Sequence, residues 1–304
     1  MSPAGRPWSH WGLLISLVML WGSSFSLTRI AVAQLTPPMV VMGRNAVAAL
    51  LLGTLLLLWR RGLPRGRRVW AYMAVIAVIG NAMPFLLISW GQQRIDSGLA
   101  GILMAAMPLV TLVLAHFFID GERLARHKVA GFVVGFVGIV VLIGPSALAE
   151  LGGQGETLVA QLAVLGASIC YAVNTIVARR KPTSDVYATS AVVLGMAMLL
   201  TLPMALAPVW QATLPMPEPS AAALWAMVLL GVMSTAAGSV VYFKLIAAAG
   251  PTFLSLINYL IPLWAVMIGT LFMAERLAWH HLLALALILL GVAVSQRRVT
   301  VPGA

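Results

Sequence analysis

GLAGILMAAMPLVTLVLAHFFIDGERL, residues Gly98–Leu124, is the stretch that decides the fold. It is apolar for about twenty residues, the length of one membrane-spanning helix, and it contains one proline, Pro108. A second stretch from Phe253, FLSLINYLIPLWAVMIGTLFMAERLAWH, repeats the pattern with Pro262, at an offset of 153 to 154 residues. The offset is about half of the 304-residue chain. We therefore interpret the chain as two copies of one unit, residues 1–149 and 150–304.

Composition indicates the solvent in which the chain folds. Hydrophobic residues make up 61% of the sequence and charged residues 9%, and the apolar residues come in long runs. A soluble domain could not bury so much apolar surface, whereas runs of 18 or more residues are typical of membrane-spanning helices. The net charge of +11 does not indicate nucleic-acid binding, because the basic residues lie between the runs instead of on one folded face. The single Cys170 excludes an intrachain disulfide.

The apolar runs predict an all-α integral membrane protein with ten transmembrane helices. They lack the alternation of about ten residues that marks outer-membrane β-strands. The predicted spans are 11–33, 37–59, 69–91, 97–119, 127–144, 157–178, 185–208, 221–243, 251–273 and 278–295.

The basic residues between the spans predict the orientation. With the N-terminus in the cytoplasm, fifteen Lys and Arg residues lie on the inner side and only Arg94 and Arg276 lie in the outer connections. This positive-inside bias places both termini in the cytoplasm. Because each copy has five helices, an odd number, the second copy enters the membrane inverted relative to the first, as in many secondary transporters.

These residues resemble a known family. The chain is similar to the drug/metabolite transporter superfamily in a pattern that repeats at half length. The pattern consists of Trp21–Gly22–Ser23–Ser24–Phe25, a proline followed by Arg44, and the Pro108 segment that ends in Gly121–Glu122–Arg123–Leu124. Its ten-helix EamA-type branch includes bacterial exporters of amino acids, aromatic ones among them. The resemblance implies a secondary transporter of the bacterial inner membrane that moves amino acids or related metabolites, outward, by alternating access.

Polar side chains inside the spans are the candidate substrate-binding residues, since a polar group facing lipid is costly and should face the bundle interior. Pro108 and Pro262 are candidate hinges, because a proline frees the carbonyl one turn back and permits bending. The candidate binding residues are Trp21, Ser24, Arg44, Asn45, Asn81, Trp90, Met104, Tyr171, Asn174, Ser234, Tyr242, Asn258 and Tyr259.

Each candidate also has a structural interpretation. Serine, threonine and asparagine often link membrane helices to one another, and Trp90 could anchor a helix end at the membrane interface. Arg44 could bind helix-end carbonyls or a substrate carboxylate. Glu122 and Glu275 are expected to satisfy free N–H groups at the start of the helices that follow them.

Other functional classes fit less well. No Asp or Glu lies inside a span, and no nucleophile–base, metal-ligand or cofactor motif is present, so we expect no enzyme, no metal and no cofactor. Export of drugs or hydrophobic solutes, and a non-transporting receptor or scaffold, stay open as alternatives. The fifth and tenth spans have no polar side chain over residues 129–144 and 282–294, so we place them at the periphery, facing lipid or a partner, in a monomer or weak dimer.

Overall fold

The computed structural model describes residues 7–119, 125–149, 156–180, 185–210 and 218–295. This part of the chain is helical and contains no strand. Its elements are α1 (Trp8–Val32), α2 (Pro37–Leu58), α3 (Arg67–Ala77), η1 (Val78–Ala82), α4 (Met83–Gly91), α5 (Ser97–Met104), α6 (Met107–Phe118), α7 (Arg126–Ala149), α8 (Glu156–Arg180), α9 (Val186–Trp210), α10 (Ala221–Leu229), η3 (Leu230–Ala237), α11 (Gly238–Ala249), α12 (Pro251–Leu254), α13 (Ile257–Phe272) and α14 (Trp279–Ser295).

The predicted all-helical class is confirmed for these residues. Every predicted span overlaps one helix or a run of consecutive helices, such as α3–η1–α4 or α5–α6. Among the described residues, seven such helices or runs are long and apolar enough to cross a membrane, and α13 and α14 are shorter apolar helices. These findings support a membrane protein, while the inverted ten-helix repeat stays a prediction.

Two π-helical segments interrupt otherwise continuous α-helices at corresponding places. η1 separates α3 from α4, and η3 separates α10 from α11, with starting residues 152 positions apart. In a π-helix the hydrogen bonds reach one residue further, which shifts carbonyl groups out of the α-helical ladder and is frequent at functional sites. The sequence pattern gave no sign of either segment.

The two candidate hinge prolines occupy different local positions. Pro108 lies in the first turn of α6, directly after the break that separates α5 from α6. A proline is well tolerated there because a first-turn N–H has no intrahelical partner. Pro262 lies inside α13, beyond the break between α12 and α13. Its missing N–H leaves the carbonyl of Asn258, one turn earlier, without its helical donor.

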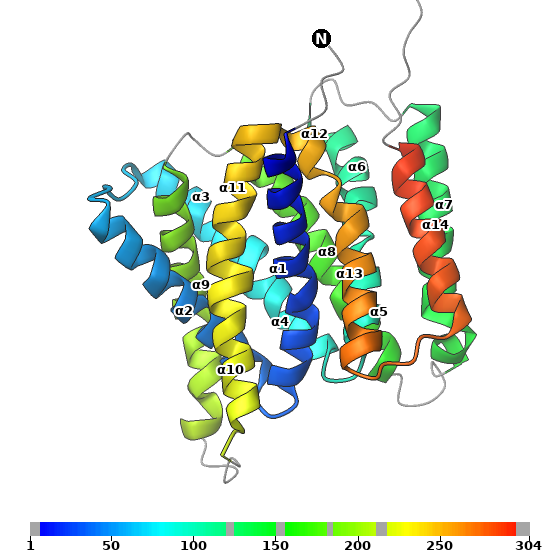
Figure 1. Cartoon of the computed structure of the whole chain (residues 1–304), viewed down its shortest axis with the longest axis horizontal. Helices are drawn as coiled ribbons and strands as arrows, with labels where there is room; N and C mark the ends of the chain where they lie inside the picture. The colour runs from blue at the N-terminus through cyan, green and yellow to red at the C-terminus, as the bar shows by residue number, and fades with distance from the viewer. Residues whose placement is uncertain (1–6, 120–124, 150–155, 181–184, 211–217, 296–304) are drawn as a thin grey trace, which may run out of the picture.

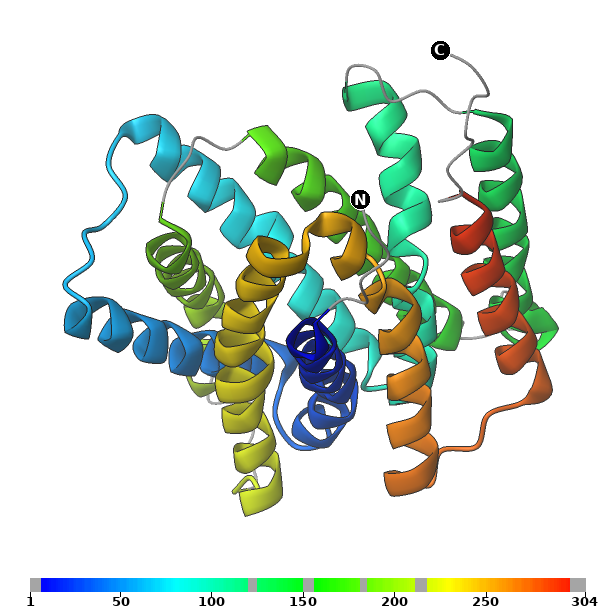
Figure 2. The same cartoon turned by 45° about the horizontal axis from the view of Figure 1, so that its top comes forward.

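The helices pack in corresponding pairs. α1 packs against α10, α11 and α13, whereas α8 packs against α4, α5 and α6. α2 packs against α9. α7 lies along α14 at one edge of the bundle, as Figures 1 and 2 show from two directions. Gly131 of α7 sits directly against the backbone of Gly291 in α14, so these small residues bring the two backbones together within the chain.

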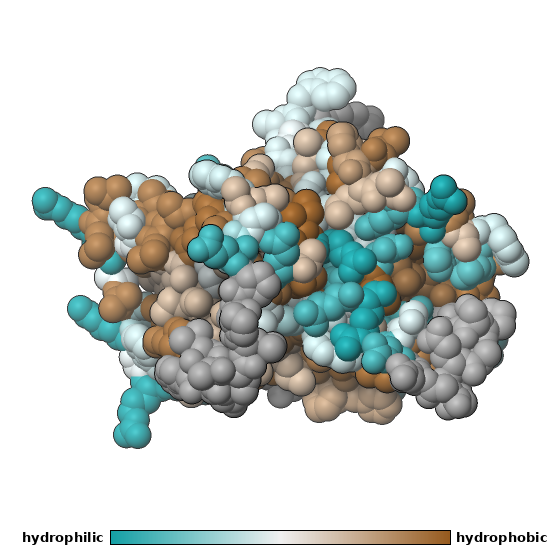
Figure 3. Space-filling model, turned by 90° about the horizontal axis from the view of Figure 1, so that it is seen from below, coloured by the Kyte–Doolittle hydropathy of each residue, from teal (hydrophilic) through white to brown (hydrophobic). Residues whose placement is uncertain are grey.

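The outer surface has the distribution expected of a protein in a bilayer. Many large apolar side chains are exposed on the outer faces of the helices, including Val133 and Phe136 on α7 and Leu282 and Leu290 on α14. Seen from below, one end of the bundle carries a band of hydrophilic residues across its middle, with apolar residues at its margins (Figure 3). Apolar sides and a polar end suit a chain that crosses a membrane.

Candidate functional site

The first cluster joins α1 to η3 and α11. Trp21 donates its indole Nε1–H to the carbonyl of Ser234 at 3.0 Å, and the Ser234 hydroxyl donates to the carbonyl of Leu20 at 2.9 Å. The ring centroids of Trp21 and Tyr242 are 5.4 Å apart. A Cβ atom on Gly238 would lie 2.5 Å from Trp21 Nε1, so only glycine leaves room for the indole. The structure therefore brings Trp21, Ser234 and Tyr242 together, as the sequence predicted for one site.

A second tryptophan extends this contact toward α13. Trp264 donates its Nε1–H to the Ser23 hydroxyl at 2.9 Å, and its side chain lies against Gly22. Trp264 was not among the sequence candidates. The Trp-Gly-Ser-Ser-Phe motif of α1 thus serves as a contact surface for helices from the second half of the chain.

Arg44 forms the centre of another buried cluster. The residue is 5% exposed, and its Nε and Nη2 donate to Thr235 Oγ1 at 3.2 and 3.0 Å. Its Cζ lies 3.8 Å from the ring centroid of Phe85, a cation–π contact. Phe85 in turn meets Tyr171 edge-on, with ring centroids 6.4 Å apart. Arg44 and Tyr171, predicted separately, are joined through Phe85, and neither Phe85 nor Thr235 was predicted.

The buried asparagines retain hydrogen-bonding capacity. Asn174, one turn beyond Tyr171 on α8, lies against Gly80 in η1, and its Oδ1 has no hydrogen-bond partner among the described residues. Asn45 is fully buried, and neither its Oδ1 nor its Nδ2 has a partner there. Asn81 donates to the carbonyl of Ile76 over a long 3.4 Å. Buried polar atoms without partners are costly, which makes Asn45 and Asn174 the stronger candidates for contact with a polar solute.

The remaining candidates lie outside these two clusters or are bonded locally. The Ser24 hydroxyl donates to the carbonyl of Trp21 in its own helix. Trp90, near the end of α4, lies 4.8 Å from the Arg94 guanidinium. Met104 packs at the edge of the apolar cluster around α5. Asn258 and Tyr259 are half-buried in the first turn of α13, between Leu256 and Leu260, which pack like Trp21 against one apolar cluster.

Glu275 closes one end of the bundle. Its carboxylate accepts hydrogen bonds from the Ser97 backbone N–H at 2.8 Å, the Ser97 hydroxyl at 2.6 Å and the Gly98 N–H at 2.9 Å. The prediction that Glu275 would cap the helix that follows it was wrong, because the carboxylate caps α5, 178 residues earlier in the chain. Free N–H groups and the helix dipole at the α5 N-terminus favour a negative charge there. Glu122 lies outside the described residues.

Further polar residues surround this cap and define what we term the Glu275 face. Arg29, in the last turn of α1, donates to the carbonyl of Gln92 and lies 3.9 Å from Asp96. Gln92, fully buried, donates its Nε2 to the carbonyl of Phe25 at 2.9 Å. Burial raises the pKa of Asp96 above its usual value, the nearby charge of Glu275 raises it further, and Arg29 opposes both.

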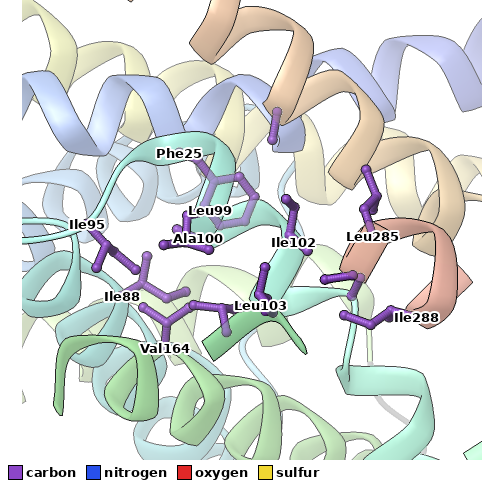
Figure 4. Close-up of a cluster of buried hydrophobic side chains, with 14 of the residues drawn as sticks. Phe25, Ile88, Ile95, Leu99, Ala100, Ile102, Leu103, Val164, Leu285 and Ile288 are labelled. Atoms are coloured by element: carbon purple, nitrogen blue, oxygen red, sulfur yellow. The ribbon is translucent and has the colours of Figure 1, made fainter. Parts of the chain in front are cut away.

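The interior behind the Glu275 face is apolar. Residues Ser97–Leu103 of α5 are all buried, whereas Leu109 is the one buried residue of α6. Figure 4 shows the apolar cluster behind the face, where side chains from α1, α4, α5, α8 and α14 meet. The two parts of the fourth predicted span are thus packed very differently.

The polar groups do not form a metal centre. No group of three or more His, Cys, Asp and Glu side chains is close enough to hold a metal ion in the described ranges. What the arrangement offers is a set of buried aromatic, amide and guanidinium groups between helices of the two halves, which suits reversible binding of a small solute.

The fold defines a polytopic helical membrane protein with polar and aromatic groups buried between its helices. The EamA-like transporter family matches residues 9–144 and again residues 158–296, and the chain belongs to this family. It is 24% identical over 297 residues to an uncharacterized transporter of Archaeoglobus fulgidus, covering 95% of this chain and 99% of the relative.

Two further similarities extend over nearly the whole chain. The uncharacterized transporter YoaV of Bacillus subtilis is 23% identical, with 92% of this chain and 94% of the relative covered. A solved structure described as a crystal structure of a protein has a TM-score of 0.63 at 20% identity, covering 95% and 97% of the two chains, and this supports the fold alone. The family identifies the chain as a membrane transporter; the solute follows from none of these similarities.

Proposed function

We propose that the chain is an alternating-access carrier built from two inverted copies, residues 1–149 and 150–304. Two exposed ion pairs support the inversion. α1 is the first helix of the first copy, and α8 is the first helix of the second. Arg94, at the Glu275 face, pairs with Glu156 at the start of α8 at 3.0 Å, so α8 starts near the face where α1 ends. Arg61, just beyond α2, bonds Asp185 at the start of α9 at 2.6 Å, so α9 starts where its counterpart α2 ends.

The difference in packing along the fourth span supports the transport mode. The Glu275 cap and the buried α5 hold the two halves together at one face, whereas α6, the opposite part of the same span, is largely half-exposed. A carrier that exposes its site to one side at a time needs one closed end and one open end. The α5–α6 break before Pro108, and the carbonyl freed by Pro262 in α13, are the proposed hinges.

The proposed substrates are amino acids or related small metabolites, moved outward across the bacterial inner membrane. The observation that carries the binding site is the contact of Trp21 with Ser234 and Tyr242, because it joins the two halves at a π-helix. Amino acids and the outward direction come from the family resemblance. The buried charge of Arg44 favours them over hydrophobic cations, which it would repel. The charge count of the connections supports cytoplasmic termini, and we propose a monomer or weak dimer.

Counterflow in proteoliposomes tests this function. Vesicles loaded with one of the twenty amino acids should take up the same labelled amino acid, whereas vesicles screened with hydrophobic cations should not exchange them. Trp21→Ala and Asn258→Leu should impair exchange and leave membrane insertion intact. Trp279→Ala is the matched control, because Trp279 is 75% exposed. Exchange of the cations alone would refute the proposed substrate class, and wild-type kinetics in both variants would move the site elsewhere.

A further inference from the structure

Among the described residues, Arg44 is a buried cation without an acidic partner. Seven of the eight acidic residues of the chain lie outside the predicted spans, and the eighth, Asp185, is the first residue of its span. The ion pairs found in the described part of the chain join Arg29, Arg61 and Arg94 to acids at the ends of helices, and none includes Arg44. Arginine stays protonated in proteins, so its charge is permanent. A buried charge is stable only when paired or well hydrogen-bonded, and a charged residue inside a membrane span indicates a functional site by default.

The structural alternative for Arg44, a bond to helix-end carbonyls, is not what the described residues show. Its one hydrogen-bonding partner there is the hydroxyl of Thr235. That hydroxyl donates its own hydrogen to the carbonyl of Leu230 at 2.9 Å, a contact across the π-helical segment η3. Thr235 therefore presents only lone pairs to Arg44 and acts as a fixed acceptor.

The geometry orients the guanidinium. Phe85 covers one face of the planar group at 3.8 Å, and Thr235 accepts from its Nε and Nη2. Nη1 makes no hydrogen bond within the described residues. A guanidinium held in this way retains N–H groups in its plane for an oxygen ligand, and carboxylates match such groups with two parallel hydrogen bonds.

From these observations we propose that Arg44 binds the carboxylate of the transported solute, with Phe85 and Thr235 as positioning residues. This inference rests on the proposed carrier function and narrows its substrate to molecules with a free carboxylate, zwitterions or monocarboxylates. Arg44 on α2 of the first half is hydrogen-bonded to Thr235 in η3 of the second half. The solute would thereby occupy a site shared by both halves.

Matched substrates provide the test. Each amino acid that the wild type exchanges is compared in counterflow with its methyl ester and its carboxamide, which keep the side chain and remove the negative charge. We expect the wild type to favour the free acid by at least about 100-fold in kcat/KM, since a charge-assisted bidentate contact is lost in both analogues. Arg44→Gln should reduce that ratio to within a few-fold of one, and Arg44→Lys should retain part of it.

Two further variants keep the test decisive if Arg44→Gln does not fold. Thr235→Ala removes the acceptor that orients the guanidinium and should lower the acid preference while leaving the charge in place. Arg61→Gln removes an arginine just beyond the end of α2, in an exposed pair with Asp185, and should keep the full ratio. A direct binding measurement, the thermal stabilisation of purified protein by the free acid against its ester, should follow the same order.

The outcomes separate this inference from the proposed function. Exchange of amino acids with an unchanged acid-to-ester ratio in folded Arg44→Gln and in Thr235→Ala would overturn the assignment of Arg44 and leave the carrier function standing. Stabilisation of the wild type by benzoate or acetate, lost in Arg44→Gln, without exchange of any amino acid, would support Arg44 as a carboxylate site and refute amino acids as the substrates.

Discussion

The cap on α5 gives the sharpest quantitative prediction. The Glu275 carboxylate accepts three hydrogen bonds, two of them from backbone N–H groups of Ser97 and Gly98. Glu275→Ala leaves both N–H groups without their partner, at a cost of about 1–3 kcal/mol for each buried donor, so we expect a loss of about 3 kcal/mol. Glu275→Gln keeps one acceptor oxygen but turns an NH₂ group toward a donor, and should lose about half as much.

The same contact can be disrupted without touching the glutamate. A Cβ atom on Gly269 would lie 2.2 Å from Glu275 Oε2 and 2.9 Å from its Cδ. Gly269→Ala therefore forces the carboxylate away from its donors and should destabilise the protein, although alanine is the better helix former by about 1 kcal/mol. Gly195→Ala is the matched control, because nothing lies within 4 Å of a Cβ atom there.

Thermal unfolding in detergent, followed by the fluorescence of the ten tryptophans, measures these effects. One kcal/mol corresponds to about 2 °C in Tm for a chain of this size, so Glu275→Ala should lower Tm by about 6 °C and Glu275→Gln by about 3 °C. Glu156→Gln breaks the exposed pair with Arg94 and should change Tm by less than about 2 °C. Tm values for Glu275→Ala and Gly269→Ala within 1 °C of wild type would refute the cap as a stabilising contact.

Three further predictions follow from charge and topology. The pKa of Asp96 is raised from its ordinary value of 3.8 in the folded protein. Between 3.8 and the raised pKa, the folded protein therefore binds more protons than the unfolded chain. The contribution of this carboxyl to stability should then grow as pH falls through that range. Asp96→Asn should therefore have the higher Tm at neutral pH, and the two Tm curves should converge in acid; a lower Tm for Asp96→Asn at pH 7 would contradict this. A cysteine in the Pro215–Pro219 connection should react with an impermeant thiol reagent from outside, and one at Gly66 should not; labelling of both from one side would rule out the inverted repeat. Counterflow should need no pH gradient and should survive His116→Gln, and pH-driven concentrative uptake of an electroneutral solute that is lost in this variant would instead make His116 the coupling residue.

Sequence patterns alone predicted the helices and proposed the polar and aromatic residues of a binding site. The helix positions followed from runs of apolar residues, because the need to satisfy backbone groups in a membrane leaves helices as the solution for long apolar segments. Trp21, Ser234 and Tyr242 were among the predicted binding residues because polar and aromatic groups inside spans should face the interior, and the structure brings these three into contact. Ser24 shows the limit of that reasoning, since its hydroxyl bonds the carbonyl of Trp21 in its own helix.

The residues that sequence reasoning missed are those whose role depends on a distant partner. Phe85 and Trp264 look like ordinary apolar residues of a span, and only the packing of the helices brings one under the Arg44 guanidinium and the other against Gly22. Glu275 was expected to act locally, yet its carboxylate fits the N-terminus of α5 from the other half of the chain. Thr235 gained its role from η3, because the π-helical register lets its hydroxyl reach the carbonyl of Leu230.

The sequence by itself determined the membrane as the solvent, the helical class, the internal repetition and the absence of acidic residues from the interior of the spans. Hydropathy, helix length and composition are local properties of the chain. The tertiary structure decided which polar groups meet. Arg44 and Thr235 are 191 residues apart, and Trp21 and Ser234 are 213 apart, and their contacts depend on the direction of whole helix faces. Those directions are set by the packing of small residues between helices and by two π-helical segments, which rotate every side chain beyond them relative to an uninterrupted α-helix.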